Sequence, residues 1–458
     1  MKYKYFLILL TAFSIFNAAN ELDPLEILKE YVSIDTVNPP GNESNAVEFL
    51  GDILKDFGIE YKAYESAPGR GNLIARINGG DMPALILMHH TDVVPFNAEY
   101  WISDPMVAEE IDGYLYGRGV IDMKGLGVQH LMAFLDAFKN KEKLNRDIIF
   151  MATADEEAGG LFGVGWLIDN HPEVFDGAGY VLNEGGSGLD IDGQKIFNVE
   201  VTQKVPVWLK LTAEGVPGHG SMPRKSSAVI KILKALSALN DNPFTPRIIP
   251  PVDEYFKSLA MDMNEPEASL FKNLARSVKN KKFIDDLQDD NAGLHALTRD
   301  TCSITMLKGS SKINVIPPTA SAEVDCRMLP DREVKEFLAD FKKIVEPFDV
   351  DVEVLLSFKR GVSSRDSSLY KTIEKVTSEL YKNSKVIPSV ATGFTDSHFT
   401  RDLGIESYGF NPTLYPAGEA RGIHGNNERV SIKLFRQSTA DLTQIVQEFT
   451  QKKISEKK

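Results

Sequence analysis

The sequence predicts an α/β protein in which a mixed-sheet α/β/α domain is interrupted by a smaller inserted domain. Two observations predict this fold class. Short apolar runs that suit buried strands, such as residues 84–94 and 148–153, alternate with segments of helical periodicity. Between residues 205 and 358 the order changes to strand, helix, strand, strand, helix, strand, which is that of a ferredoxin-like layer.

Composition supports this organisation and excludes one class of partner. The 458 residues are 43% hydrophobic and 25% charged, so the chain can bury two separate cores. The net charge is -14, and no long run of Lys or Arg precedes the basic tail, so we expect no nucleic-acid partner. The predicted segments are a signal peptide (1–20), the first part of the larger domain (21–204), the inserted domain (205–358) and the second part of the larger domain (359–458).

The first 20 residues have the composition of a secretory signal peptide. Lys2 and Lys4 precede an apolar run at residues 6–16, and Ala18 and Ala19 offer a small-residue cleavage site. The run is too short for a membrane span of about 20 residues. We expect an exported protein, periplasmic or secreted, that is free of the membrane after cleavage; an uncleaved anchor is the alternative.

The N-terminal region predicts two helices and then strands. Asp23 followed by proline marks one helix start, and a second helix at residues 44–57 should stop at Gly58. Strands are expected at residues 59–65, 72–78 and 84–94, the last buried on both faces. Function is expected at its polar end, HHTD, because open α/β sheets bind ligands beyond the carboxyl ends of strands.

Three further acidic sites follow in the chain. Asp122 stands before a helix predicted at 124–139, where it could face a bound cation; the alternative is that it is an ordinary helix N-cap. Glu184 ends the strand-like run GYVLNEGG. Glu156 and Glu157 follow strand 148–153, and adjacent side chains there point in different directions, so one carboxylate can bind metal while the other carries a proton. The alternative is a solvated charge cluster.

The inserted domain and the C-terminal region carry fewer chemical signals. Cys302 and Cys326 lie in strands that could pair, so either a disulfide or two reduced buried thiols is possible. Residues 241–299 form an extra polar, helical stretch with no chemistry that we can read. Helices at residues 368–381 and 431–451 then return the chain to the first domain.

Candidate metal ligands gather at the predicted strand ends: His90, Asp92, Asp122, Glu156, Glu157, Glu184 and His424. Two imidazoles with several carboxylates suit Zn²⁺ or a similar ion, and the surplus of carboxylates suits two ions. If Asp122 bridges, His90 and Glu184 complete one site, and Glu157 and His424 complete the other. Glu156 is then free as a base and Asp92 is free to orient His90.

Six motifs occur in order along nearly the whole mature chain: HTDVVP, GRGVIDMKG, DEEAGG, NEGG, PGHGSMP and IHGNNE. In these motifs and their order, the chain resembles the co-catalytic dizinc aminoacylase, glutamate-carboxypeptidase and succinyl-diaminopimelate desuccinylase family. The resemblance implies two divalent ions, Zn²⁺ or alternatively Co²⁺ or Mn²⁺. It also implies the ligands His90, Asp122, Glu157, Glu184 and His424, with Glu156 as general base and Asp92 as partner of the first histidine.

The resemblance implies further roles in the inserted domain, which would act as a lid. His219 would stabilise the tetrahedral oxyanion in the partner subunit's site, so catalysis would require a homodimer formed through the lid. Gly220 departs from the serine of many relatives. Asn314 and Arg327 would hold the substrate's α-carboxylate, since a guanidinium can bond it bidentately. The alternative for Arg327 is a salt bridge to Asp325 or Asp331.

Other residues are less specific. Gly418 lies in a loop, residues 415–418, that could add backbone amides near the scissile group. His89 is interpreted as packing beside the ligand, and His398 is open between a substrate-side and a structural role. The remaining histidines, His130, His171 and His295, are interpreted as structural or surface residues.

The resemblance implies hydrolysis of an N-acyl amino acid or of the C-terminal bond of a small peptide. A desuccinylase or dipeptidase on the same scaffold is the alternative. A noncatalytic exported protein that binds peptide or metal is a third hypothesis, but it would be expected to have lost the base or a ligand, and the sequence keeps both.

Overall fold

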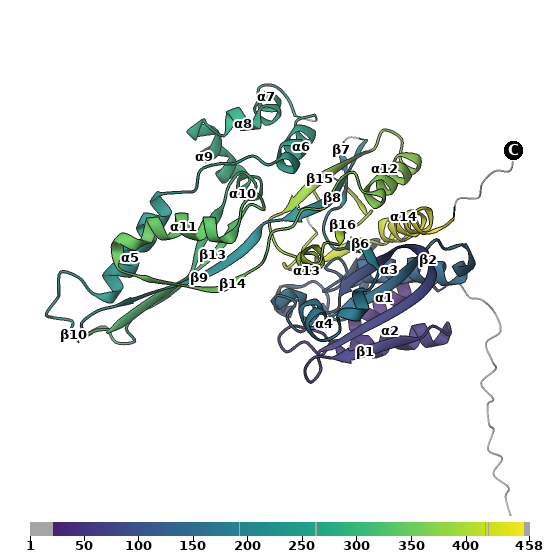
Figure 1. The fold of residues 1–458 in the computed structure, drawn as a ribbon, viewed down its shortest axis with the longest axis horizontal. Helices are drawn as coiled ribbons and strands as arrows, with labels where there is room; N and C mark the ends of the chain where they lie inside the picture. Colours follow the sequence, from purple (N-terminus) through teal and green to yellow (C-terminus); the bar gives the residue numbers. More distant parts are fainter. Residues whose placement is uncertain (1–21, 192, 262, 417, 420, 453–458) are drawn as a thin grey trace, which may run out of the picture.

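The computed structural model describes residues 22–191, 193–261, 263–416, 418–419 and 421–452. The predicted signal peptide therefore lies outside the described residues. Figure 1 shows a broad α/β body joined to an elongated second body through the long strands β8 and β9, Gln194–Gln203 and Val205–Glu214. Lys204 alone separates these two strands.

A nine-stranded mixed sheet forms the centre of the larger body. Its order is β1-β2-β6-β16-β8-β7-β17, with β5 paired to β2 and β15 paired to β8. The pairs β2–β6, β6–β16 and β8–β15 are parallel, whereas β1–β2 and β7–β8 are antiparallel. The strands other than β8 are β1 Tyr61–Glu65, β2 Gly71–His90, β5 Arg146–Thr153, β6 Ala178–Asn183, β7 Gly188–Ile191, β15 Lys385–Ala391, β16 Glu406–Gly409 and β17 Leu414–Pro416.

Strand β2 joins two runs that the sequence predicts as separate strands. Ile77 and Leu85 both pair with Ile148 of β5, so the two arms of β2 lie on opposite sides of that strand. The second arm is buried from Ala84 to His90, as predicted for a strand covered on both faces.

Alternate residues of the central strands face two helical layers. Leu85 and Leu87 belong to one hydrophobic core, and Ile86 and Met88 belong to the other. The first layer holds α1 Pro24–Ser33, α2 Ser44–Asp56, α3 Lys124–Lys139, α12 Ser368–Leu380 and α14 Ile432–Thr450. The second layer holds α4 Val164–Asn170 and α13 Ser397–Asp402. This arrangement confirms the predicted α/β/α fold class.

The elongated body contains a four-stranded sheet in the order β11-β13-β9-β14. With its two helices the chain order is β9-α5-β11-β13-α11-β14, and all pairs are antiparallel, as in a ferredoxin-like sheet. The bounds are α5 Ala228–Asp241, β11 Thr301–Lys308, β13 Thr319–Met328, α11 Val334–Val345 and β14 Asp351–Ser357. A separate core of residues from Val205 to Phe358 fills the space between sheet and helices.

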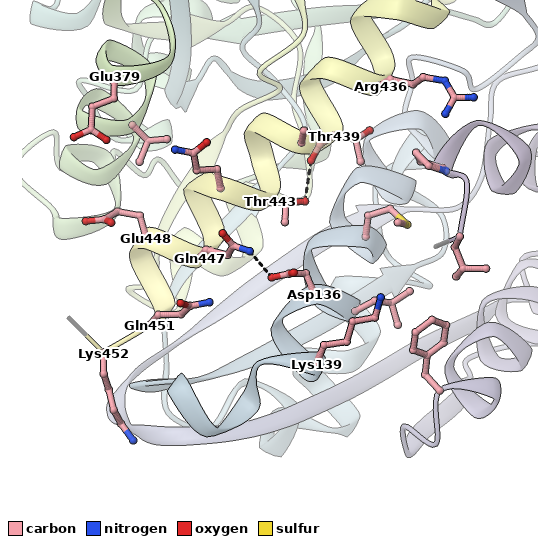
Figure 2. Close-up of a pocket in the computed structure, with 18 residues that line it drawn as sticks. Asp136, Lys139, Glu379, Arg436, Thr439, Thr443, Gln447, Glu448, Gln451 and Lys452 are labelled. Carbon is pink, nitrogen blue, oxygen red and sulfur yellow. Dashed lines mark hydrogen bonds between the residues drawn. The ribbon is translucent and has the colours of Figure 1, made fainter. Parts of the chain in front are cut away.

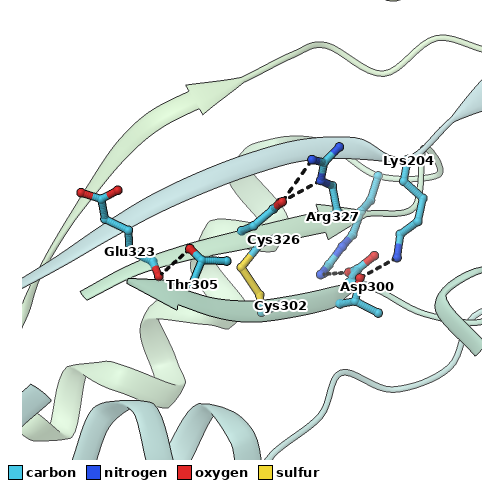
Figure 3. Close-up of a disulfide and its surroundings, with 10 residues drawn as sticks. Lys204, Asp300, Cys302, Thr305, Glu323, Cys326 and Arg327 are labelled. Atoms are coloured by element: carbon cyan, nitrogen blue, oxygen red, sulfur yellow. Dashed lines mark hydrogen bonds and ion pairs between the residues drawn. A yellow bond between two sulfur atoms is a disulfide. The ribbon is translucent and has the colours of Figure 1, made fainter. Parts of the chain in front are cut away.

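The two cysteines of the chain form a disulfide between neighbouring strands of this sheet. Cys302 of β11 stands opposite Cys326 of β13, and their sulfur atoms are bonded (Figure 3). The structure therefore selects the disulfide over two reduced thiols.

The extra stretch between α5 and β11 is helical, as expected. Its helices are α6 Pro250–Leu259, α7 Glu267–Lys272, α8 Leu274–Ser277, α9 Lys281–Asp290 and α10 Ala292–Ala296. They have a core of their own, and Val390 of β15 belongs to it. The insertion therefore packs against the main sheet as well as the lid.

Small pairings complete the fold. Strands β3 Glu109–Ile111, β4 Tyr114–Tyr116 and β18 Arg429–Ser431 form a three-stranded sheet beside the loop that leads into α3. Strands β10 Gly218–His219 and β12 Val315–Ile316 pair at the far tip of the elongated body (Figure 1). In the part of the chain that the structure describes, no helix has the length and apolar character needed to cross a membrane.

Candidate dinuclear metal site

Strand ends at one edge of the main sheet bring the predicted ligands together. His90 is the last residue of β2, and Glu184 follows β6 directly. Glu156 and Glu157 begin a short 3-10 turn that is separated from β5 by two residues. Asp122 lies before α3, whose N-cap position is taken by Met123, so Asp122 does not cap that helix. Parallel pairing of β2 with β5 and β6 places these ends side by side.

Asp122 stands between the two predicted imidazole ligands. Its Oδ1 is 3.2 Å from His90 Nε2, and its Oδ2 is 3.0 Å from His424 Nε2. Each carboxylate oxygen therefore faces a different histidine. A carboxylate held in this way can bridge two cations, one on each oxygen.

Each side of Asp122 has one further carboxylate. Glu184 Oε2 lies 3.7 Å from His90 Nε2, and Glu157 Oε2 lies 3.1 Å from His424 Nε2. Two donor sets result, in each of which the donor atoms lie within 4.8 Å of one another. They are His90, Asp122 and Glu184, and Asp122, Glu157 and His424. One imidazole with two carboxylates suits Zn²⁺ and ions of similar softness. The donor chemistry thus fits two metal ions that share Asp122.

Glu156 lies beside the first set. It is 6% exposed, and its Oε2 is 4.0 Å from His90 Nε2. Its neighbour Glu157 is the residue that contacts His424, so the adjacent carboxylates reach different parts of the site as predicted for this turn.

Asp92 connects His90 to the turn. His90 Nδ1 lies 2.9 Å from the backbone oxygen of Asp92 and 3.5 Å from its carboxylate. The carboxylate accepts the backbone N–H groups of Glu156 and Glu157, each at 3.2 Å. Asp92 thereby fixes a histidine and both glutamates, since its main chain and side chain serve different partners.

Asp155, the first acid of the DEE triplet, supports the turn that carries Glu156 and Glu157, a role that the sequence did not suggest. Asp155 has a positive φ of 74° and is almost fully buried. It accepts hydrogen bonds from Arg70 Nη2 at 2.7 Å and Asn38 Nδ2 at 3.2 Å. Asn38 also donates to Asp92 at 2.8 Å. A buried carboxylate with these donors holds the backbone that presents Glu156 and Glu157.

Glu428 is a second missed residue, although it ends the quoted motif IHGNNE. Its carboxylate is fully buried, accepts the N–H groups of Gly119, Ile121 and Asp122, and pairs with Arg118 at 2.6 Å. Its position four residues after His424 was the sequence feature that could have pointed to a role in the site. Its partners lie more than 300 residues earlier in the chain, and only the fold reveals them.

The site carries an excess of negative charge. Burial, together with the charge of Glu184, raises the pKa of Glu156 well above its usual range. Burial likewise raises the pKa of Glu184. Burial would also raise the pKa of Asp122, but hydrogen bonds from His424 and His90 outweigh it and hold that pKa below its usual range. Carboxylates that repel one another in a buried cluster favour bound cations.

The model of peptidase family M20/M25/M40 matches residues 86–448, which include every residue of the two donor sets. The chain belongs to this family. Its fold is therefore that of an M20 protein, and the chain is a metal-dependent hydrolase.

Individual M20 relatives are similar over most of the chain. An N-fatty-acyl-amino acid synthase/hydrolase PM20D1 of Xenopus tropicalis is 30% identical over 426 residues, which cover 89% of this chain and 82% of the relative. Aminoacylase-1 of Sus scrofa is 27% identical over 429 residues, with 92% and 93% covered. An M20 family metallo-carboxypeptidase structure from Sulfolobus solfataricus has a TM-score of 0.70 at 20% identity and covers 93% of this chain and 99% of its own.

The lid residues lie apart from the M20 donor sets within one chain. His219 is in β10 at the far tip of the lid (Figure 1), and its Nδ1 lies 2.8 Å from Ser221 Oγ. Asn314 directly precedes β12, the partner strand of β10. Gly418 is exposed and has a φ of 77°. The structure therefore does not bring His219 and Asn314 to the site of their own chain.

Arg327 makes the contact that the alternative interpretation anticipated. Its Nε and Nη2 donate to the two carboxylate oxygens of Asp325 at 2.7 and 3.1 Å. Asp331 instead pairs with Arg247 at 3.0 Å. Figure 3 shows Arg327 on the same strand as Cys326. The predicted bond from Arg327 to a substrate carboxylate would have to share the guanidinium with Asp325.

His89 and His398 have packing roles. His89 is buried, and its Nε2 lies 3.3 Å from the Tyr31 hydroxyl. His398 is 5% exposed and stacks on Phe358 with ring centroids 3.6 Å apart. It does not line the cavity beside the donor sets. This placement favours the structural role of His398 over the substrate-side role.

A cavity of about 600 Å³ opens directly beside the donor sets. Asp122 and Glu184 are among its lining residues. A larger hollow of about 890 Å³ lies between α3, α12 and α14 (Figure 2). None of the predicted site residues lines that hollow, so we assign the chemistry to the smaller cavity.

Proposed function

We propose that this M20 protein hydrolyses the amide bond of N-acyl amino acids at a two-metal site. The observation that carries the proposal is the sharing of Asp122: one oxygen faces His90 and the other faces His424. Glu184 and Glu157 complete the two donor sets that share Asp122. Glu156 lies beside them in a third group of close donor atoms with His90 and Glu157, and we assign it the role of base rather than of ligand.

Two divalent ions held by these donor sets would supply Lewis acidity toward the amide carbonyl and toward an attacking water. Glu156 lies beside the donor sets, where it can accept a proton from an attacking water and pass it to the leaving amine, and burial raises the pKa of its carboxylate well above the usual range. Asp92 keeps His90 oriented while Asp155 holds the turn that carries Glu156. We propose Zn²⁺ as the ion, with Co²⁺ or Mn²⁺ as alternatives.

The substrate class is supported by the relatives. Sequence similarity covers most of an N-fatty-acyl-amino acid synthase/hydrolase and of an aminoacylase-1. Both names refer to an acyl group joined to an amino acid, and that junction is an amide bond. A C-terminal peptide bond, a dipeptide or a succinylated diamino acid offers the same amide, and these remain the alternative substrates on this scaffold.

The active unit that we propose is a homodimer formed through the lid. Strand β11 is an edge of the lid sheet and exposes Ile304, Met306 and Leu307, which are 42%, 57% and 59% accessible. On α5, Ile230 and Leu233 are also exposed. An exposed apolar edge strand favours pairing with a second chain. His219 of the partner subunit would then supply the N–H that stabilises the oxyanion.

We also propose that the protein is exported. The disulfide between Cys302 and Cys326 supports an oxidising compartment, because cytosolic reductants keep most thiols reduced. The apolar segment at residues 6–16 supports the same location outside the cytosol.

A substrate panel on the metal-loaded protein tests the function. N-acyl amino acids, dipeptides and succinylated diamino acids are compared by the rate of amine release, with Glu156→Gln as the inactive control. We expect N-acyl amino acids to give the highest kcat/KM. Turnover of dipeptides alone would overturn the assignment in favour of a dipeptidase, and no turnover of any amide would support a binding protein.

A further inference from the structure

The helical insertion between α5 and β11 reaches the cavity beside the metal ligands. Tyr255 of α6 and Leu294 of α10 line that cavity together with Leu297, which follows α10. Asp122 and Glu184 line the same space. A segment for which the sequence suggested no chemistry therefore forms part of the site.

The side of the cavity formed by the insertion is largely apolar, with Asn291 and the Tyr255 hydroxyl as its polar groups. Leu294 and Leu297 meet Val390 of β15 there, and all three belong to or pack on the insertion's own core. Val390 and Leu297 are 7% and 4% exposed, so this wall is the outer surface of a packed core and keeps its shape. We call these residues, with Tyr255, the insertion wall.

The insertion wall is anchored to the catalytic domain at two points. Lys204, between β8 and β9, is fully buried, and its Nζ donates to the carbonyls of Ala296 and Arg299 at 2.7 and 2.9 Å. Figure 3 shows Lys204 beside the strands of the lid. At the other side, Glu254 of α6 forms an ion pair with Arg365. These contacts fix the wall relative to the metal ligands.

The position of the cavity relative to the two carboxylates beside His90 bears on which half of a substrate it takes. Glu184 lines the cavity, whereas Glu156, the base that we propose for proton transfer to the leaving amine, does not. We therefore assign the acyl group, rather than the amine, to this cavity.

We infer that the insertion wall binds an apolar acyl chain and sets the chain length that the enzyme accepts. This inference rests on the proposed function. A cavity of about 600 Å³ lies within the size range of small-molecule pockets, and an apolar wall favours methylene groups. Asn198, with a buried Oδ1 that accepts no hydrogen bond within the described structure, lies on the cavity's polar side.

The test compares acyl chains of increasing length on one amino acid. For the metal-loaded wild type, kcat/KM should rise about 4-fold per methylene until the cavity is full. Leu294→Trp narrows the cavity and should lower the ratio of kcat/KM for dodecanoyl to that for butanoyl substrate at least 10-fold. Leu294→Ala should move the optimum to longer chains.

Leu270→Ala is the matched control, because Leu270 is an exposed leucine of the same insertion on α7 and does not line the cavity. It should leave the ratio unchanged. An unchanged ratio in Leu294→Trp would overturn the inference. Failure of the wild type on every N-acyl amino acid would instead reject the proposed function.

Discussion

Glu428 accepts the backbone N–H of Asp122 at 3.1 Å, so a buried carboxylate fixes the main chain of the residue that faces both histidines. The same carboxylate pairs with Arg118, which is 2% exposed. The geometry of the shared aspartate therefore depends on a residue that is not itself one of the predicted metal ligands.

Glu428→Gln should weaken both stability and metal binding. It leaves Arg118 buried without its counter-charge, and removal of one partner of a buried ion pair costs about 3 kcal/mol or more. Loss of a residue that supports a ligand lowers metal affinity by about 10 to 100-fold. Chemical denaturation and competition with a chelator measure the two effects. Glu448→Gln, at an exposed ion pair with Lys375, is the control and should change neither.

Glu156→Gln and Glu157→Gln should differ although the residues are adjacent. Glu156→Gln should keep two ions per chain and lose about 10² to 10⁴-fold in kcat, because it removes a proton acceptor only. Glu157→Gln should also lose one ion, since it removes a donor of the set with His424. Elemental analysis beside the kinetic assay separates them. Equal metal content with equal activity loss would contradict these distinct roles.

Removal of metal should abolish hydrolysis reversibly. Dialysis against a chelator should yield inactive folded protein, and two equivalents of Zn²⁺, Co²⁺ or Mn²⁺ per chain should restore turnover. Circular dichroism checks that the fold is retained. Full activity after complete chelation would remove the metal site from the mechanism.

Complementation tests whether His219 acts across a dimer. His219→Ala and Glu156→Gln should each be inactive alone, but a co-expressed mixed dimer has one intact site. Random pairing at equal amounts should give about a quarter of wild-type activity for a two-fold dimer. A mixture as inactive as either parent would place His219 outside the partner's site.

His398 should make the protein less stable in acid. Burial and the nearby charge of Arg401 lower the pKa of His398 to about 3, whereas an unfolded histidine titrates near 6.5. Between these values only the unfolded state binds the proton, so stability is complete above about pH 6.5 and falls as the pH drops toward 3.

His398→Phe preserves the stack on Phe358 and should flatten this decline by up to about 1.4 kcal/mol per pH unit. Urea unfolding of the chelated protein from pH 4 to 7 measures it. Thr372→Ala, a change at a partly exposed position on α12, is the control. Parallel curves for His398→Phe and wild type would contradict the assignment.

Local patterns determined most of the secondary structure. The helix predicted at residues 124–139 is α3 with the same bounds, and Gly58 ends α2 with a positive φ of 70° as a C-terminal glycine should. The sequence also predicted that His90, Glu184 and the DEE turn lie at the ends of strands. Hydrophobic periodicity and turn-forming residues are properties of neighbouring positions, so they can be recognised in the sequence.

Only the tertiary structure decided which distant residues meet. The sequence could not show that Glu428 holds Asp122, that Arg327 pairs with Asp325 rather than Asp331, or that Cys302 and Cys326 are bonded. Nor could it show that Leu294 lines the cavity beside Asp122. Pairings across hundreds of residues depend on strand order and domain placement, and these are set by the packing of whole layers rather than by local propensity.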